Sequence, residues 1–329
     1  MAESRLLPLL AAAALLGAAL LLTWRRRRRP GAAATWTPAG RLAAIHLYPL
    51  KSGAGQRCQR VRVTRLGVRR GAVLDRCLAV VYQGRVVSAS ARRRLVLVAA
   101  DVDANGVTLT APGMPPLTVP FPQDGDDVSM VSGTLFGYPS SGVDLGPVVS
   151  RWLAEFFGDA GVYTLMYFLP GVVTPRRTVD IPKPYASLAS PDDISAFTNV
   201  TPISVICTSS LDALNSRMET PVFLENFRHN LIIEGAPAFD DDNWSFVKIG
   251  DAVLRRIKPV QRCPTTCVNP QTGERSERME PLKTLRTFRL AKTEDEKKLY
   301  KEAPLFGTGL GVDVEGDVAV GDAIYVLRK

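Results

Sequence analysis

Short segments in which apolar and polar residues alternate, or in which apolar residues run without interruption, recur through most of the chain. Alternation predicts a strand buried on one face, and an uninterrupted run predicts a strand buried on both faces. Turn residues separate these segments at close spacing, which is typical of a β-rich protein. The predicted strands are Leu42–Leu47, Val61–Leu66, Leu78–Tyr82, Arg94–Ala99, Val107–Leu109, Leu117–Val119, Thr201–Cys207, Leu231–Ile233 and Val253–Ile257.

Two segments carry apolar residues at helical spacing instead. Val148–Phe157 follows Gly146-Pro147, and its Trp152 and Phe156 are expected in the core. The second helix is predicted over Leu211–Met218, with the hydroxyl residues Thr208–Ser210 as its N-terminal cap. Helices are therefore expected to be few.

Gly-Asp pairs occur at two turns, Gly250-Asp251 and Gly321-Asp322, and each precedes a segment of alternating apolar and polar residues. Turns of this kind recur in small closed barrels. The pattern as a whole predicts an α+β fold that is mostly β, in two parts, with helices at the edges.

One segment departs from the β pattern. Leu6–Trp24 contains nineteen residues without a charge. A helix of that length reaches roughly 28 Å, close to the thickness of the bilayer hydrocarbon. Residues 1–24 are therefore predicted to form one transmembrane signal-anchor helix, and residues 25–40 a basic linker rich in Pro and Gly.

The charges beside this segment predict its orientation. Arg25–Arg29 follows the apolar run, whereas a cleavable signal peptide carries its charge before the run, so cleavage is the less favoured alternative. The positive-inside rule places the following body in the cytosol. A short anchor flanked by arginines suits the mitochondrial outer membrane, with the endoplasmic reticulum membrane as the alternative.

Composition excludes several classes of function. The net charge of the chain is +9, and Arg25–Arg29 supplies five of these charges, so the body carries too little charge for a nucleic-acid-binding protein. Only two histidines occur, which excludes a histidine-rich metal site. The five cysteines form no C-x-x-C pair and are odd in number, which fits a reducing compartment better than a disulfide framework.

The stretch Lys258–Gly273 holds the candidate chemistry. Cys263 follows Arg262 at the end of a predicted strand, and a cation beside a cysteine favours the thiolate, a ligand that soft metals prefer. The alternative is that Cys263 and Cys267 are small buried apolar residues. Local spacing does not separate these two interpretations.

Two further segments place cations next to predicted strands. Lys51 and Ser52 lie in a turn between Pro49 and Gly53, a combination that can bind phosphate and equally occurs in an exposed turn. Arg76 precedes the strand at Leu78, and Asp75 is its expected ion-pair partner.

Taken together, these segments resemble a known family. The ordered motifs YPLKS, LDRC, FTNVTP, LDALNSR, NFRHN, RCPTTCVNPQTG and PLFG are similar to those of the MOSC-domain family, and in particular to mitochondrial amidoxime-reducing components. The resemblance implies an N-terminal MOSC β-barrel domain over residues 41–172 and a MOSC β-barrel domain with peripheral helices over residues 173–329.

The resemblance also implies a molybdenum cofactor, Mo-molybdopterin, and a set of residues that hold it. Cys263 is the expected metal ligand and catalytic residue. The implied cofactor-binding residues are Lys51, Ser52, Arg76, Asn199, Val200, Thr201, Arg228, Asn230, Gln261, Arg262 and Cys263.

This chain departs from the family pattern at several positions. Family members often carry Asp where this chain has Asn199 and Asn269, proline where it has His229, and threonine where it has Cys267. The two amides remove carboxylates that donate protons or orient groups near the metal, and reduction of an N–OH group consumes two protons.

The implied function is a membrane-anchored oxidoreductase that reduces N-hydroxylated compounds, such as amidoximes and hydroxylamines, to amidines and amines. Because Gly307, Gly309 and Gly311 lack a dinucleotide-binding context, electrons are expected from docked partners, which in the family are cytochrome b5 and NADH-cytochrome b5 reductase. One alternative is a carrier or binding module for the cofactor without turnover. Another is a membrane-tethered interaction protein in which Cys263 is merely buried.

Overall fold

A computed structural model describes residues 34–123, 125–135, 137–180 and 188–329. The predicted anchor at residues 1–24 lies outside these described residues. Within them, no helix combines the length and the apolar character needed to cross a membrane. Residues Thr37–Lys329 form one compact unit.

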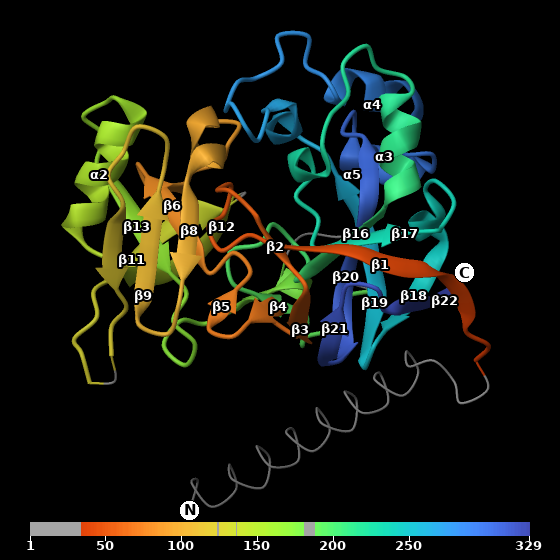
Figure 1. Ribbon diagram of the computed structural model, residues 1–329, viewed down its shortest axis with the longest axis horizontal. Helices are drawn as coiled ribbons and strands as arrows, with labels where there is room; N and C mark the ends of the chain where they lie inside the picture. Colours follow the sequence, from red (N-terminus) through yellow and green to blue (C-terminus); the bar gives the residue numbers. More distant parts are fainter. Residues whose placement is uncertain (1–33, 124, 136, 181–187) are drawn as a thin grey trace, which may run out of the picture. The chain divides into compact units, whose positions relative to one another are not determined.

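The larger barrel is built mainly from the C-terminal half of the chain (Figure 1). Its strands follow the order β17-β16-β20-β19-β18-β22-β1, and β1 pairs with β17 to close the ring, while β2 extends the sheet beyond β1. The bounds are β1 (Thr37–Leu47), β2 (Gln56–Cys58), β16 (Ile203–Cys207), β17 (Leu231–Glu234), β18 (Trp244–Ile249), β19 (Ala252–Gln261), β20 (Leu305–Val314) and β22 (Ala323–Arg328).

Strand β1 closes this barrel although it comes from the start of the compact unit. It runs antiparallel to both neighbours, with Ile45 opposite Leu231 of β17 and Thr37 opposite Val326 of β22. Its regular structure begins at Thr37, before the predicted start at Arg41. The C-terminal barrel therefore takes one of its strands from a segment far away in sequence.

The smaller barrel contains β6 (Leu78–Tyr82), β7 (Arg85–Val86), β11 (Met130–Leu135), β12 (Tyr138–Asp144) and β13 (Tyr163–Tyr167). A parallel pairing between β11 and β7 closes it. Helix α2 (Pro147–Phe157) lies against this barrel in Figure 1, and the predicted core residues Trp152 and Phe156 are buried. The mostly β fold with two barrels, predicted from the sequence, is confirmed.

Smaller sheets complete the unit. A sheet of β21 (Gly316–Ala319), β3 (Arg60–Thr64), β4 (Gly67–Arg70) and β5 (Val73–Leu74) joins segments from both ends of the chain. The other sheets contain β8 (Ala99–Val102), β9 (Gly106–Thr110) and β10 (Leu117–Pro120), and β14 (Arg176–Arg177) with β15 (Ile194–Ser195).

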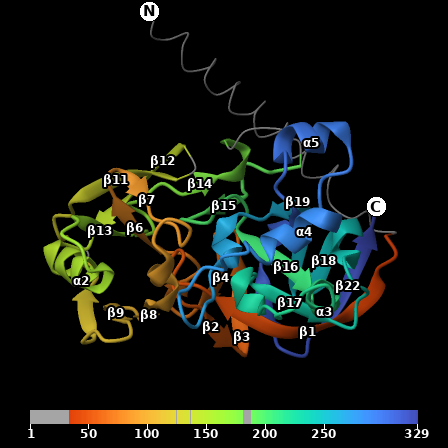
Figure 2. The same cartoon turned by 90° about the horizontal axis from the view of Figure 1, so that it is seen from above.

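Helices α3 (Thr208–Asn215), α4 (Leu282–Phe288) and α5 (Glu294–Tyr300) lie at one end of the larger barrel (Figures 1 and 2). Short 3-10 turns occur at Arg93–Leu97 (η2), Thr178–Asp180 (η3), Leu224–Asn226 (η5), Asp240–Asn243 (η6) and Pro264–Cys267 (η7).

The strand predicted at Arg94–Ala99 is wrong over most of its length. Residues Arg93–Leu97 form the turn η2, in which Leu95 and Val98 donate backbone hydrogen bonds to carbonyls three residues earlier. The strand β8 begins only at Ala99. An uninterrupted apolar run shows burial but no period, so it does not separate a strand from a buried turn.

The cap predicted for the second helix is also wrong. Helix α3 begins at Thr208, so the three hydroxyl residues lie in its first turn. Their side chains serve tertiary contacts instead: Ser209 Oγ donates to the Ala236 carbonyl over 2.7 Å, and Ser210 Oγ accepts from the Phe239 amide over 2.8 Å.

A separate apolar cluster lies between the larger barrel and its helices. It contains Leu214, Phe227, Ile232, Leu285 and Phe306, all buried. The rings of Phe227 and Phe306 are 4.6 Å apart between centroids. This packing fixes the backbone carbonyls of both phenylalanines, which the candidate site uses.

Candidate functional site

A tight turn after β1 presents the first candidate residues. The Lys51 amide donates to the Leu78 carbonyl of β6 over 2.8 Å, and the Gly53 amide donates to the Leu50 carbonyl over 3.0 Å. Ser52 has a φ of 64°. Lys51 and Ser52 are both buried, so the exposed-turn interpretation is wrong.

The ammonium of Lys51 points toward residues far away in sequence. Its Nζ donates to the Phe197 carbonyl over 2.9 Å and to Asn199 Oδ1 over 2.5 Å. Burial lowers the pKa of Lys51 well below its usual value, and the positive charges of Arg76, Arg176 and Arg228 lower it further. A negative charge at Cys263 acts in the opposite direction, so the thiol is within electrostatic range of this lysine.

Arg76 pairs with Asp75, as predicted from the sequence. The carboxylate is fully buried and also accepts a hydrogen bond from the Tyr48 amide over 2.9 Å. Arg76 additionally donates to the Arg228 carbonyl over 2.7 Å. The ion pair thus joins the turn after β1 to the segment that carries Arg228.

Arg228 lies over the ring of Tyr48, with its guanidinium carbon 4.2 Å from the ring centroid, and Arg76 lies 4.8 Å from the same centroid. Arg228 donates to the Gly53 carbonyl over 2.5 Å. Burial lowers the pKa of Arg228 to about 10 and raises that of Tyr48 to about 12. Two guanidinium groups therefore lie near one buried phenol ring.

Asn230 connects these elements through its side chain. Its Oδ1 accepts from the Ser204 amide over 3.2 Å and from Arg76 over 3.4 Å, while its Nδ2 donates to the His46 carbonyl over 3.3 Å. Because both the oxygen and the nitrogen of its side-chain amide form hydrogen bonds, Asn230 positions Arg76 and links it to β16 and β1.

Arg262 is buried and held by neutral acceptors. Its guanidinium donates to the Phe306 carbonyl over 2.9 Å, to the Phe227 carbonyl over 2.8 Å, and to Nε2 of His229. Burial lowers the pKa of Arg262 to about 9 and, together with the charge of Arg262, lowers that of His229 well below its usual value. A neutral histidine can accept this hydrogen bond, so His229 leaves the positive charge of Arg262 uncompensated.

Cys263 differs from the other cysteines. It lies between β19 and the turn η7 and is half-buried, whereas the other four cysteines are buried. Burial raises the pKa of each of those four thiols, which are Cys58, Cys77, Cys207 and Cys267. Of the five thiols, only Cys263 combines access to solvent with an adjacent buried cation.

The remaining predicted cofactor-binding residues are Val200, Thr201 and Gln261. The Val200 carbonyl accepts from Thr178 Oγ1 over 2.9 Å, and Thr201 Oγ1 donates to the Ile203 carbonyl over 3.1 Å. A side chain at Gly309 would overlap Thr201, with 2.7 Å between the new carbon and Oγ1. Gln261 ends β19 and is exposed.

Sequence reasoning missed Arg176, which is not among the predicted cofactor-binding residues. Strand β14 pairs Arg176 with Ser195, and its guanidinium donates to the Thr198 carbonyl over 2.6 Å. Its charge is among those that lower the pKa of Lys51. The basic pair Arg176-Arg177 was visible in the sequence, but no local signal indicated that Arg176 and Lys51 share one environment.

Two of the departures from the family pattern have structural roles. Asn269 Oδ1 accepts from the Gln271 amide over 2.8 Å, which an aspartate would do equally well. Cys267 is buried, and its Sγ contacts the Met279 carbonyl over 3.4 Å. Asn199 is different, because its neutral amide contacts Lys51 where an aspartate would compensate the charge.

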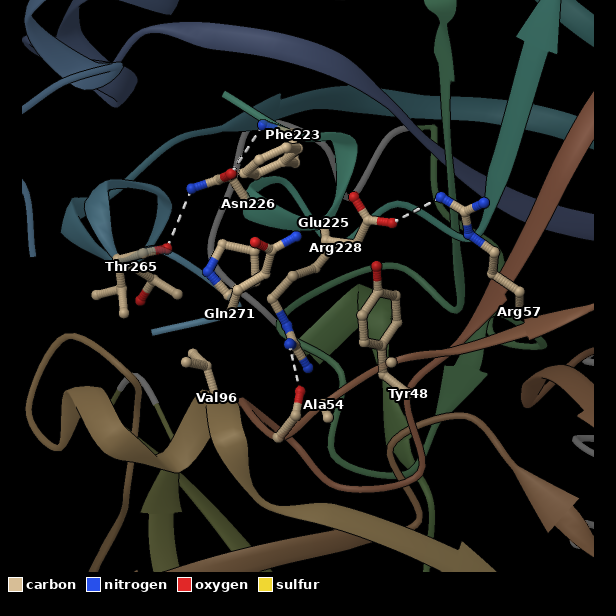
Figure 3. Close-up of a pocket in the computed structure, with 14 residues that line it drawn as sticks. Tyr48, Ala54, Arg57, Val96, Phe223, Glu225, Asn226, Arg228, Thr265 and Gln271 are labelled. Atoms are coloured by element: carbon tan, nitrogen blue, oxygen red, sulfur yellow. Dashed lines mark hydrogen bonds and ion pairs between the residues drawn. The ribbon is translucent and has the colours of Figure 1, made fainter. Parts of the chain in front are cut away.

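A pocket of about 480 Å³ lies beside Arg228, which is one of its lining residues (Figure 3). Its walls come from the turn after β1, the segment around η5, the segment that follows Cys263, and Val96 of the turn η2. Tyr48 and Arg228 line it, and Thr265 brings it close to the thiol in sequence.

The chemistry of these groups fits a bound anion and a soft metal. Arg228 and the buried Arg262 donate to backbone carbonyls, and Arg262 also donates to the neutral His229, so both guanidinium groups can attract a phosphate. The described residues contain no group of three or more His, Cys, Asp or Glu that could hold a metal ion. A metal bound by Cys263 would therefore bring further ligands with it, as a cofactor does.

Two family models and several known proteins match this chain. The family model described as "MOSC domain" matches residues 192–325, and that described as "MOSC N-terminal beta barrel domain" matches residues 39–160. Mitochondrial amidoxime-reducing component 1 of Xenopus laevis is 36% identical over 301 residues, which cover 91% of this chain and 86% of that protein. The Homo sapiens component 1 is 34% identical over 88% of this chain and 84% of that protein. Component 2 of Rattus norvegicus is 34% identical over 87% of this chain and 83% of that protein.

Proposed function

This chain belongs to the MOSC-domain family of the mitochondrial amidoxime-reducing components, and on that basis we propose that it is a molybdenum-cofactor oxidoreductase that reduces N-hydroxylated compounds. The observation that carries the proposal is the half-buried thiol of Cys263, which follows Arg262 and lies within electrostatic range of the buried Lys51. Such a site favours a thiolate ligand and a bound anion together.

Each group of residues would hold a different part of the cofactor. Cys263 would ligate the metal through Sγ. Lys51, Arg76 and Arg228 would bind the phosphate, since their charges lie close together. The segment Asn199–Thr201 would contact the pterin.

When bound, the molybdenum cofactor would supply the two electrons that, with two protons, convert an N–OH group to an N–H group and water. The two protons must come from elsewhere. Solvent reaches the half-buried Cys263, so water would supply them.

The electron donor in this proposal is cytochrome b5 with NADH-cytochrome b5 reductase. The protein would be anchored by residues 1–24 in the mitochondrial outer membrane with its body in the cytosol, the endoplasmic reticulum membrane being the alternative. The mitochondrial names of the relatives support the first location. The five arginines that follow the apolar run support the orientation.

A second candidate function is a carrier of the cofactor without turnover. The amide at Asn199 favours it, because an amide cannot take up and deliver a proton as the carboxyl group of an aspartate could. Both functions require the same cofactor, so activity alone separates them.

The test is metal and pterin analysis of the full chain, produced in a host that synthesises molybdenum cofactor, beside Cys263→Ala. We expect near-stoichiometric molybdenum and pterin in the parent, and a protein without bound metal or without activity in the variant. Cys267→Ala, which changes a buried thiol in the same turn, is the matched control and should retain the metal. A folded parent that contains neither molybdenum nor pterin contradicts both functions. Reduction of benzamidoxime with reduced cytochrome b5 then separates a reductase from a carrier.

A further inference from the structure

The pocket in Figure 3 is distinct from the predicted cofactor site, although the two share a wall. Of the eleven residues that the family resemblance assigns to the cofactor, only Arg228 lines this pocket. Thr265 lines it two residues after Cys263. The pocket therefore shares Arg228 with the predicted cofactor site, and Thr265 places it within two residues of Cys263 along the chain.

Hydrogen bonds join the segment around η5 to two other walls of the pocket, the segment after Cys263 and the turn after β1. Asn226 Nδ2 donates to the carbonyls of Thr266 and Val268, each over 3.0 Å, and its Oδ1 accepts from the Phe223 amide over 3.0 Å. Arg228 donates to the Gly53 carbonyl in the turn after β1. Because these walls are tied to one another, the pocket is formed before any ligand binds.

The turn after β1 contributes two glycines to the pocket, and neither has room for a side chain. A side chain at Gly55 would place its first carbon 2.4 Å from Cε1 of Tyr48, and one at Gly53 would lie 2.8 Å from the Val98 carbonyl. Neither position tolerates a side chain, so this wall is flat backbone beside the Tyr48 ring.

Apolar residues from other segments also line the pocket. Val268 and Pro270 follow the turn η7, Val96 lies near Ala54, and Phe223 lies across the pocket from Ala54 in Figure 3. Phe223 is 43% exposed although it is large and aromatic. At the rim, Arg57 and Glu225 form an ion pair with 3.1 Å between nitrogen and oxygen, so their charges compensate each other. A volume of about 480 Å³ lies within the ordinary range for small-molecule sites.

We propose that this pocket is the subsite for the planar, uncharged organic part of the substrate, and that Phe223 is the side chain that determines its preference for aromatic substrates. The inference rests on the proposed reductase function. An aromatic ring between the backbone wall at Gly53–Gly55 and Phe223 covers the exposed ring of Phe223, which gains stacking contacts. The N–OH group of the same molecule then faces the segment that carries Cys263 and Thr265.

The test is steady-state kinetics of the cofactor-loaded full chain with benzamidoxime and with the small substrate N-methylhydroxylamine. Phe223→Ala is expected to raise KM for benzamidoxime about three- to tenfold, and to leave kcat for both substrates and KM for N-methylhydroxylamine unchanged. Phe223→Tyr keeps the ring and is expected to restore the KM. Leu290→Ala changes a residue of similar exposure, 40%, outside the pocket and serves as the control.

Two further measurements separate the inference from the proposed function. The molybdenum and pterin content of Phe223→Ala should equal that of the parent, since a loss would assign the pocket to the cofactor and overturn the inference. Saturation-transfer NMR with benzamidine, which is not reduced, should show binding to the parent and less binding to Phe223→Ala. An unchanged benzamidoxime KM, or an equal increase for both substrates, overturns the inference while the function stands. A parent that reduces neither substrate overturns the function, and the benzamidine comparison still decides whether Phe223 binds an aromatic ring.

Discussion

Three of the predicted cofactor residues have an unusual backbone conformation. Ser52, Arg76 and Arg228 have φ values of 64°, 51° and 58°, and they belong to seven non-glycine residues with positive φ in the described chain. This conformation is unfavourable for residues with a Cβ atom and is found where the surroundings impose it, often at functional sites. Hydrogen bonds hold the backbone around these residues: the Gly53 carbonyl accepts from the Arg228 side chain, the Tyr48 carbonyl from the Arg76 amide, and the Arg228 carbonyl from the Arg76 side chain.

Lys51 is expected to lower the free energy of unfolding of the cofactor-free protein, while it contributes to binding of the cofactor. Its folded-state pKa is lowered by burial, so the unfolded chain binds more protons between that value and the ordinary lysine pKa, and stability rises with pH over this window. Lys51→Met should therefore increase the free energy of unfolding of the cofactor-free protein at pH 7, by about 1 kcal/mol, and flatten the rise toward alkaline pH. Urea unfolding at pH 7 and pH 10 measures both effects.

The same variant should fail to retain pterin, because a phosphate-binding cation is lost. Lys248→Met changes an exposed lysine of β18 and should alter neither property. A Lys51→Met protein that is less stable at pH 7, or that retains the full amount of pterin, contradicts this role for Lys51.

At the scale of elements, Asn226 holds the short turn η5 against the turn η7. Asn226→Ala removes two hydrogen bonds to buried carbonyls and one from the Phe223 amide, so we expect a loss of about 2–3 kcal/mol in the free energy of unfolding. Because both turns form walls of the pocket, KM for benzamidoxime should rise as well. Thermal unfolding and kinetics together check the two effects.

The control for that variant is Asn215→Ala. Asn215 makes a comparable pair of hydrogen bonds between helix α3 and Val222, outside the pocket lining. It should lower stability while KM stays constant. If both variants change KM equally, the effect of Asn226 is general destabilisation and not alignment of the pocket.

The elements themselves were predictable where their pattern is periodic. Leu78–Tyr82 has the bounds predicted from its apolar run, and Pro147–Phe157 is the helix that its spacing indicates. Prediction failed at Arg93–Leu97, because an apolar run that is buried on all sides carries no period. It failed again at Thr208–Ser210, where contacts with Ala236 and Phe239 use the hydroxyls expected to form a cap.

At the scale of the whole molecule, the larger barrel depends on β1. A fragment of residues 173–329 contains the other strands of the ring but lacks β1, so β17 and β22 would each expose an unpaired edge and the core beneath them. We expect this fragment to aggregate or to lack a cooperative thermal transition. Circular dichroism and differential scanning calorimetry would show this.

Adding residues 34–50 after Lys329 through a short turn should restore folding. Thr37 lies opposite Val326 in an antiparallel pair, so a chain that continues past β22 can return directly along β1. A fragment of residues 173–329 that unfolds cooperatively without the added strand contradicts this dependence on β1.

The sequence by itself determined the properties that depend on near neighbours. Alternation and turn residues predicted a β-rich fold, the motif order indicated the family, and Arg262 beside Cys263 indicated the candidate thiol. The membrane anchor at residues 1–24 stays a prediction from the sequence.

Only the tertiary structure decided which distant residues share one environment. It brought Lys51 and Arg176 to the neighbouring carbonyls of Phe197 and Thr198, used Asn230 to position Arg76, and formed the Phe223 pocket from four separate segments. The physical reason is burial: a pKa, an uncompensated charge or an exposed ring depends on the groups within a few ångströms of it. Closure of the barrel by β1 brings those groups together from positions far apart in the chain.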